Sequence, residues 1–332
     1  MTAEKEKYGD IIMYRIGIDL GGTNIAAGIV NENFEIVCKD SVPTGAHRAP
    51  EAIAADMARI CYQVCEKAGI DPSEVASVGI AAPGIADHDA GLIVYSCNLP
   101  FVKYPICEEI KKAFPVGEVF VENDANAAAW GEVVAGAAKG TDNSIMITLG
   151  TGVGGGIVID RKVCSGFNYA GGELGHIVIE AGGRPCGCGR RGCWEAYSSA
   201  TALIRMTTEK LEECEASGRR TAMTSAVRKS GKVSGRTAFD AARRGDEAAQ
   251  EVVDSYVYYL AQGLTNIINI FQPEVLTIGG GISGEGQSLL DKIVPLVRAE
   301  VYGKGIVPHT DIRIAELRND AGIIGGAVLG LK

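Results

Sequence analysis

Hydrophobic and polar positions recur along the chain with two different periods, which divide it into predicted strands and helices. Short apolar runs that meet at a glycine turn predict paired strands over residues 14–30 and again over residues 144–159. Other apolar runs of strand length predict further strands over residues 34–42, 75–84, 116–124, 274–283 and 311–317. Strands that alternate with helices are typical of an α/β protein.

The helices are predicted from apolar residues that recur every three or four positions. The segment 50–69 has Pro50 near its first turn and Gly69 as a stop signal. Cys61 and Cys65 lie four positions apart on one face of this helix, where buried packing explains them. Four more segments are predicted to be helical, at residues 125–137, 246–271, 286–302 and 321–331.

Two of the strand pairs resemble each other in sequence. IGIDLG at residues 16–21 aligns with IMITLG at residues 145–150, and both segments continue to GIV with a slip of one residue. Repeated strand–turn–strand units predict two α/β domains of similar construction, with a cleft between them. The length of 332 residues agrees with two domains.

Charge argues against a nucleic-acid partner. The formal net charge is −9, whereas a nucleic-acid binder usually has a basic stripe. The most basic segment, RKSGKVSGR at residues 228–236, is interpreted as a solvated loop because its basic residues are interleaved with Ser and Gly.

The N-terminal residues MTAEKEKYGD lack an apolar segment, so no secretory signal is expected. No apolar run approaches the roughly 20 residues that cross a bilayer. We therefore expect a cytoplasmic protein with no membrane partner, in which close cysteine spacing indicates metal binding more than disulfides.

Three glycine-rich turns are candidate phosphate-binding loops. DLGGTN, LGTGVGGG and IGGGIS occupy residues 19–24, 149–156 and 278–283. Backbone N–H groups of such turns can point at an anion, and the third turn precedes a helix whose N-terminus can take a nucleotide phosphate or ribose. Neither a Walker A loop nor a convincing Rossmann fingerprint is present. A single turn of this kind is equally well explained as a plain hairpin, but three of them in both halves predict a nucleotide held between two domains.

Side chains near these turns add to the prediction. Asp19, at the end of the first strand, is suited to hold Mg²⁺ through water, because Mg²⁺ favours one or two carboxylates together with phosphate oxygens. Thr23 and Asn24 add side-chain donors. The predicted nucleotide contacts are Asp19, Gly21, Gly22, Thr23, Asn24, Gly150, Thr151, Gly152, Gly154, Gly280 and Gly281.

Asn123 and Asp124 lie where a predicted strand gives way to a helix. Both residue types are favoured N-caps, so capping alone explains them. Phosphoryl transfer, however, depends mostly on positioning and charge neutralisation, and its base accepts a hydroxyl proton late. A carboxylate with an ordinary pKa near ~4 serves as that base if it touches the hydroxyl. Since open α/β sheets bind ligands at the carboxyl ends of their strands, Asp124 is a candidate catalytic base.

The densest group of metal-ligand side chains consists of His176, Cys186, Cys188 and Cys193. One nitrogen and three sulfurs suit tetrahedral Zn²⁺, and four protein ligands leave no open position, so the metal is predicted to be structural. The alternative is a set of free thiols in a flexible loop, but a Cys-x-Cys pair with a third Cys and a His is typical of a metal clip. Glu173 and Glu195 flank the group closely, so a bound metal would fix the frame that carries both carboxylates.

Together these motifs resemble the ROK family, which comprises bacterial sugar kinases and related repressors. The resemblance runs from about Tyr14 to the end of the chain and rests on DLGGTN, AAPG, NLPF, ENDANAAA, LGTGVGGG, GGELGH, CGCGRRGCWE and AGIIGGA. The pairing of ELGH with CGCGRRGCWE is highly specific, since its spacing and order both match the family. The resemblance implies an α/β fold of the two-domain actin/hexokinase-like ATPase type (ribonuclease H-like), with the active site in the interdomain cleft.

The family pattern makes Asp124 the general base that accepts the proton of the sugar 6-hydroxyl. It implies sugar contacts from Asn98, Asn123, Asp124, Glu173, His176 and Glu195. His176 would bind zinc through one ring nitrogen and a sugar hydroxyl through the other. The expected domains are residues 1–122 with 318–332, and residues 123–317, the latter with a zinc-binding insertion at about 165–195.

The implied activity is ATP-dependent phosphorylation of glucose at the 6-hydroxyl, with Mg²⁺ on the ATP and with structural Zn²⁺. The run from NLPF to ENDANAAAWGE is most similar to glucokinases. N-acetylmannosamine kinases share nearly all these residues, so an N-acetylmannosamine, N-acetylglucosamine or other hexose kinase is the alternative. Polyphosphate is the alternative donor, and a homodimer is expected by analogy with the family.

Two other functions are alternatives to a kinase. ROK repressors carry a helix-turn-helix segment ahead of the first phosphate loop, and only about fifteen residues precede Ile16, too few for that motif. A sugar-binding protein that has lost catalysis is the remaining possibility, but DLGGTN and Asp124 are both intact. The sequence therefore favours the kinase.

Overall fold

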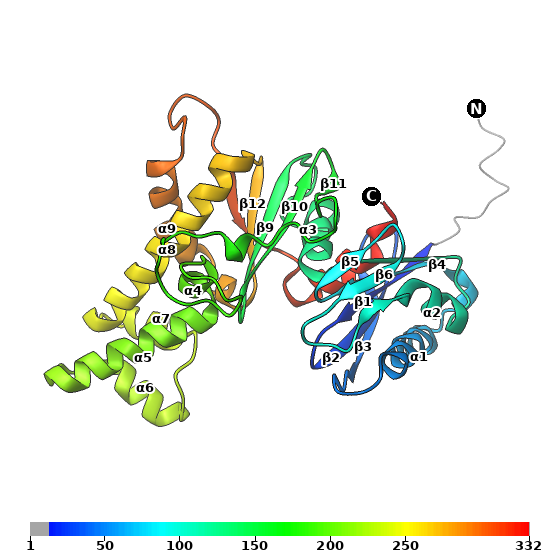
Figure 1. Ribbon diagram of the computed structural model, residues 1–332, viewed down its shortest axis with the longest axis horizontal. Coiled ribbons are helices and arrows are strands. Elements are labelled where there is room, and N and C mark those ends of the chain that lie inside the picture. The colour runs from blue at the N-terminus through cyan, green and yellow to red at the C-terminus, as the bar shows by residue number, and fades with distance from the viewer. Residues whose placement is uncertain (1–12, 332) are drawn as a thin grey trace. The chain divides into compact units, whose positions relative to one another are not determined.

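The computed structural model describes residues 13–331 (Figure 1). The described residues form two compact units. Unit 1 contains the residues up to Asp142, the segment Gly156–Gly171 and the residues from Glu316 on, whereas unit 2 contains Asn143–Gly155 and Gly172–Ala315. Among the helices of residues 13–331, none has the length and apolar character that a membrane span requires.

The core of unit 1 is a five-stranded sheet in the order β3-β2-β1-β4-β8. Its strands are β1 (Tyr14–Leu20), β2 (Asn24–Val30), β3 (Ile36–Pro43), β4 (Val75–Ala82) and β8 (Glu118–Asn123). Strand β1 pairs antiparallel with β2 and parallel with β4, and β4 pairs parallel with β8. Because β1, β4 and β8 run in the same direction, their carboxyl ends share one edge of the sheet.

Helices cover both faces of this sheet (Figure 1). On one face lie α1 (Pro50–Ala68) and α2 (Ile106–Ala113), and on the other lie α3 (Asp124–Ala135) and α10 (Ala321–Ala327). Helix α10 packs so tightly that the strands need glycines beneath it. A Cβ on Gly17 would lie 1.7 Å from the carbonyl oxygen of Ile323, and one on Gly79 would lie 1.9 Å from that of Gly326.

The compact units differ from the expected domains in their limits. Helix α3 packs against α10, where a Cβ on Gly131 would lie only 3.0 Å from the Cα of Gly325. For this reason residues 123–142 belong with the N-terminal sheet, although the sequence analysis assigned them to the second domain. Residues 156–171 likewise belong to unit 1.

A second five-stranded sheet has the order β11-β10-β9-β12-β13. Its strands are β9 (Ser144–Leu149), β10 (Val153–Ile159), β11 (Lys162–Val163), β12 (Val275–Gly279) and β13 (Asp311–Ile314). Strand β12 pairs parallel with both β9 and β13. The order matches that of the first sheet position by position, and the two similar sequences, 16–21 and 145–150, supply the central strand of each sheet, as the repeat predicts.

Apart from β9, β12, β13 and the first residues of β10, unit 2 is mainly helical. Its helices are α4 (Glu195–Ser198), α5 (Ala200–Ser217), α6 (Ala222–Ser230), α7 (Thr237–Ala242), α8 (Glu247–Phe271) and α9 (Gln287–Glu300). Helix α8 is the long helix predicted over 246–271, and the side chain of Asp246 caps it by accepting the N–H of Ala249. Helices α4, α5, α7 and α9 all pack against α8.

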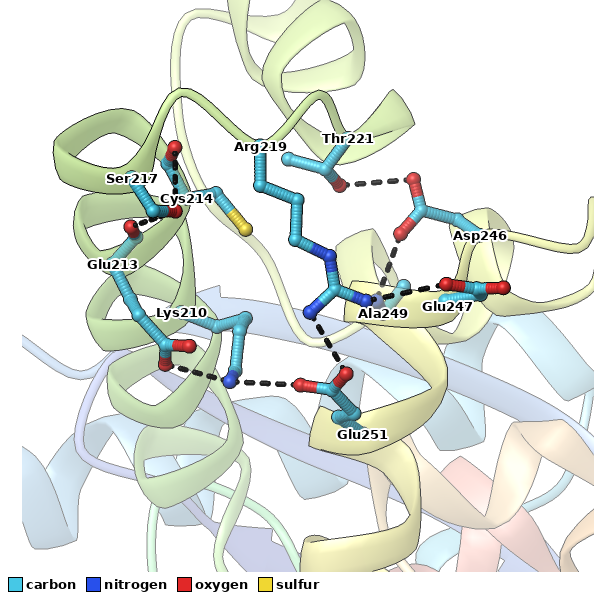
Figure 2. Close-up of polar contacts among 10 residues, drawn as sticks. All are labelled: Lys210, Glu213, Cys214, Ser217, Arg219, Thr221, Asp246, Glu247, Ala249 and Glu251. Atoms are coloured by element: carbon cyan, nitrogen blue, oxygen red, sulfur yellow. Dashed lines mark hydrogen bonds and ion pairs between the residues drawn. The ribbon is translucent and has the colours of Figure 1, made fainter.

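A polar network joins α5, α8 and the turn that leads to α6 (Figure 2). Lys210 Nζ lies 2.6 Å from Glu213 and 2.9 Å from Glu251. Arg219 lies 2.8 Å from Glu251 and 3.6 Å from Glu247. Single exposed ion pairs contribute little to stability, but these pairs share partners and so tie the ends of two helices together.

Candidate functional site

Asp19 and Asp124 lie at the shared carboxyl edge of the unit 1 sheet. Asp19 pairs with Ala81 in β4, and the next residue of β4, Ala82, pairs with Asn123 in β8. Burial and the nearby carboxylate of Asp124 raise the pKa of Asp19 to about 6. A divalent cation at this edge would stabilise both carboxylates, so the donor set fits the Mg²⁺ role predicted for Asp19.

The raised pKa of Asp19 predicts a pH-dependent loss of stability. As the pH rises from the ordinary pKa of 3.8 to about 6, the unfolded chain releases this proton before the folded chain does. Stability therefore falls over this window, by about 3 kcal/mol from this group, and stays lower above it. Asp19→Asn should accordingly raise the Tm at neutral pH and lose this advantage near pH 4. Thermal unfolding of both proteins across the window checks this, and a Tm difference that does not change with pH would contradict it.

The cap of α3 is Asn123. Its Oδ1 accepts hydrogen bonds from the N–H groups of Ala125 at 2.9 Å and Asn126 at 3.2 Å. Its Nδ2 donates to the carbonyl oxygen of Gly84 at 2.9 Å. The capping explanation therefore applies to Asn123, while Asp124 is the first helical residue and its side chain is exposed. Asp124 stays the candidate base, and sugar contacts by either residue stay predictions.

Sequence reasoning missed the residues that support this helix start. Glu122 is fully buried, and its Oε1 accepts from the backbone N–H of Asn123 at 3.0 Å and from the side chain of Asn126 at 3.2 Å. Its Oε2 lies 3.1 Å from Nδ1 of His88. The sequence did contain a signal for these contacts, because Glu122 lies at the end of an otherwise apolar strand. A carboxylate that is buried in such a position needs polar partners.

The backbone of the first glycine turn, residues 19–24, is fixed by hydrogen bonds, whereas the residues at its tip are exposed to solvent. The N–H of Gly21 donates to the carbonyl oxygen of Asn24 at 2.9 Å, and Thr44 Oγ1 donates to the carbonyl oxygen of Gly21 at 2.6 Å. Gly22, Thr23 and Asn24 are exposed. A fixed backbone with an exposed tip is what a phosphate-binding turn requires.

The other two glycine turns lie side by side in unit 2. Strands β9 and β12 are parallel neighbours, so the turns that follow them share one edge of the sheet. Gly280 has a φ of 82°, and a Cβ there would lie 2.5 Å from the carbonyl oxygen of Leu149. This approach places Gly280 against the residue that precedes the Gly150–Gly152 turn.

Two details differ from the sequence analysis. The third turn runs into a 3₁₀ helix over Gly281–Glu285, and α9 begins only at Gln287. The helix N-terminus is therefore not at the turn itself, because the positive φ of Gly280 starts a tighter helical turn first. Gly154 lies within β10 rather than in the second turn.

The four predicted metal ligands are brought together in unit 2. The ligand atoms of His176, Cys186, Cys188 and Cys193 all lie within 4.8 Å of one another. Cys186 Sγ is 3.6 Å from His176 Nδ1, and Cys188 Sγ is 3.7 Å from Cys193 Sγ. Metal–ligand distances of about 2.0–2.3 Å in a tetrahedral zinc site separate the ligand atoms by about 3.5–3.8 Å. The cluster therefore fits Zn²⁺ in both chemistry and spacing.

The histidine ring is oriented by this cluster. Nδ1 faces the thiols, whereas Nε2 lies 4.0 Å from Oε2 of Glu173. One ring nitrogen is thus available to a metal while the other faces a predicted sugar contact. The backbone carbonyl oxygen of His176 also accepts a hydrogen bond from Arg190 at 2.9 Å.

The segment 176–194, which contains the four predicted metal ligands, has few buried residues and is anchored by a few large contacts. Trp194 is fully buried, and its indole N–H donates to the carbonyl oxygen of Tyr259 in α8 at 3.0 Å. A Cβ on Gly263 would lie 1.9 Å from this indole, so α8 needs glycine there. Arg184 makes two hydrogen bonds to Glu209 in α5, at 2.7 and 2.8 Å.

Asn98 lies in a loop of a small sheet whose strands were not among the predicted elements. Strands β5 (Ile85–Asp87), β6 (Leu92–Tyr95) and β7 (Val102–Tyr104) form it in unit 1. Asn98 is exposed in the loop between β6 and β7. The structure thus assigns Asn98, Asn123 and Asp124 to unit 1, and Glu173, His176 and Glu195 to unit 2.

Comparison with known proteins identifies relatives that extend over nearly the whole chain. The sequence model of the ROK family matches residues 15–332. A glucokinase of Halalkalibacterium halodurans is 36% identical over 315 residues, which cover 95% of this chain and 94% of the relative.

Solved structures agree with this similarity. A ROK family glucokinase from Streptomyces griseus, in complex with glucose and AMPPNP, has a TM-score of 0.78 and 34% identity, with 95% of this chain and 98% of that chain covered. A ROK hexokinase from Thermus thermophilus has a TM-score of 0.77 and 32% identity, with 95% and 97% covered. The predicted actin/hexokinase-like ATPase fold is confirmed by these neighbours.

Proposed function

This chain belongs to the ROK family, and we propose that it is a glucokinase, which transfers the terminal phosphoryl group of ATP to the 6-hydroxyl of glucose. The observation that carries the proposal is its similarity to glucokinases over nearly the full chain, including one bound to glucose and a nucleotide analogue. The exposed carboxylate of Asp124 follows the carboxyl end of β8, in the parallel part of the unit 1 sheet, and supports the proposal independently.

In the proposed reaction, the glucose 6-oxygen attacks the terminal phosphorus of ATP, and the bond from that phosphorus to the bridging oxygen breaks to release ADP. Asp124 accepts the proton of the hydroxyl as the new phosphorus–oxygen bond forms. The three glycine turns bind the phosphates through backbone N–H groups. Asp19 would hold Mg²⁺ through water, and a bound Mg²⁺ neutralises charge on the phosphate oxygens.

Zinc has a structural role in this proposal. The ligands would be His176, Cys186, Cys188 and Cys193, which leave no position for substrate. The metal would order the loop that carries Glu173 and Glu195, which we expect to bind sugar hydroxyls together with Nε2 of His176. A homodimer, a cytoplasmic location and the absence of a nucleic-acid partner stay predictions.

A substrate screen tests the proposal. With ATP as donor, kcat/KM for glucose should exceed that for mannose, fructose, N-acetylglucosamine and N-acetylmannosamine by at least about tenfold, because a site built around particular hydroxyls leaves polar groups unsatisfied with other sugars. A preference for N-acetylmannosamine would instead favour an N-acetylhexosamine kinase. Replacing ATP by polyphosphate in the same screen identifies the donor.

A further inference from the structure

The chain that leaves the metal cluster also holds the second glycine turn. We call residues 193–201 the exit segment, since they follow the last cysteine and lead into α5. The N–H of Val153 donates to Oε2 of Glu195 at 3.0 Å. Further along, the N–H of Ala200 donates to the carbonyl oxygen of Gly150 at 2.8 Å, and Thr201 Oγ1 donates to that of Thr151 at 2.7 Å. Gly150, Thr151 and Val153 of the turn therefore all bond to one short segment.

Gly152 is the point of closest approach. A Cβ at this position would lie 2.2 Å from Oε2 of Glu195, so only glycine lets the carboxylate reach the turn. One carboxylate oxygen of Glu195, Oε2, thus accepts a hydrogen bond from the backbone of the turn. Its other oxygen, Oε1, lies 3.8 Å from Cys186 Sγ in the metal cluster. One carboxylate thereby touches both the cluster and the turn.

The exit segment has little freedom to move independently of the cluster. Cys193 is fully buried, and the next residue, Trp194, is fixed by the indole hydrogen bond to Tyr259. Helix α4 begins directly at Glu195, and α5 begins at Ala200. A displacement of Cys193 must therefore move the groups that bond to the turn.

We propose that the metal clip positions the second glycine turn, so that an occupied metal site supports binding of the phosphates of a nucleotide as well as binding of sugar. The inference rests on the proposed function, in which this turn binds ATP. Glu195 and Thr201 act as positioning residues for the turn. Thr201 is the cleaner probe, because Glu195 is also a predicted sugar contact.

Thr201→Val removes one hydrogen bond to the turn and leaves every metal ligand and predicted sugar contact intact. A hydrogen bond of ordinary strength corresponds to about a 2–10-fold change in affinity. We therefore expect the Kd for Mg²⁺-ADP, measured by calorimetry without sugar, to rise by about that factor, and the KM for glucose to stay unchanged. Thr208→Val is the matched control, because this hydroxyl lies on the same helix but bonds to its own backbone at Ile204.

The metal itself provides the second test. Chelation, or Cys188→Ser, should lower the zinc content per chain and weaken binding of Mg²⁺-ADP without sugar, and returned zinc should restore binding to the chelated protein. Circular dichroism identifies preparations that remain folded. Unchanged ADP affinity in a folded, metal-free preparation would overturn the proposal, and if that preparation does not fold, unchanged affinity in Thr201→Val would overturn it. ADP binding with no sugar phosphorylation would instead contradict the proposed function alone.

Discussion

Asp124→Asn is expected to lower kcat for glucose phosphorylation by about 10²–10⁴-fold, the usual contribution of a positioned general base. The substitution keeps the size and polarity of the side chain but removes its ability to accept a proton. Asn123 is the N-cap of α3, and an asparagine at position 124 can still accept the N–H of Ala125 that Asp124 Oδ1 accepts at 2.8 Å, so the helix start should survive the change. Glucose affinity should therefore stay close to that of the unaltered protein in a calorimetric titration, while steady-state kinetics record the loss of turnover.

The same chemical change elsewhere on the chain serves as the control. Asp291→Asn lies on the exposed side of α9, outside every predicted site residue, and should leave kcat unchanged. A near-normal kcat in Asp124→Asn would remove the residue from the reaction. Loss of glucose affinity and turnover together would instead assign Asp124 to sugar binding.

Loss of the metal is the second change with a large expected effect. Cys193→Ser replaces a buried ligand of the cluster and should abolish stoichiometric zinc binding. Structural zinc in small peptides contributes about 10–16 kcal/mol of apparent binding energy, which is enough to order a glycine-rich loop. We expect kcat/KM for glucose to fall by at least about 100-fold, because the frame of Glu173, His176 and Glu195 is lost.

The zinc content of the purified protein is measured alongside the kinetics by inductively coupled plasma mass spectrometry. About one zinc per chain is expected in the unaltered protein. Cys164→Ser, an exposed cysteine outside the cluster, should keep both the metal and the activity. Near-zero zinc in a fully active preparation would refute the metal clip.

The features that the sequence predicted correctly depend on local patterns. The paired strands around DLGGTN and LGTGVGGG follow from apolar runs that meet at glycine, and both pairs are present. Helix α8 follows from its period and its cap. The convergence of the four predicted metal-ligand side chains also follows from local spacing, because three of them lie within eight residues and His176 lies only ten residues before the first cysteine.

What the sequence analysis missed depends on contacts between distant segments. The strands β5, β6 and β7 are three or four residues long, too short for a clear alternation. The burial of Glu122 against His88 joins residues far apart in the chain. The assignment of α3 to unit 1 depends on α10, which comes almost two hundred residues later. Likewise, only the folded chain reveals that Glu195 contacts the second glycine turn.

The most direct measurement is the product formed from ATP and glucose by the purified protein, followed by phosphorus NMR beside a parallel reaction with 6-deoxyglucose. The account predicts that each ADP released is matched by one glucose 6-phosphate, and that the sugar without a 6-hydroxyl yields no sugar phosphate. A phosphate on any other carbon of glucose, or ATP consumption that leaves glucose unmodified, would contradict it.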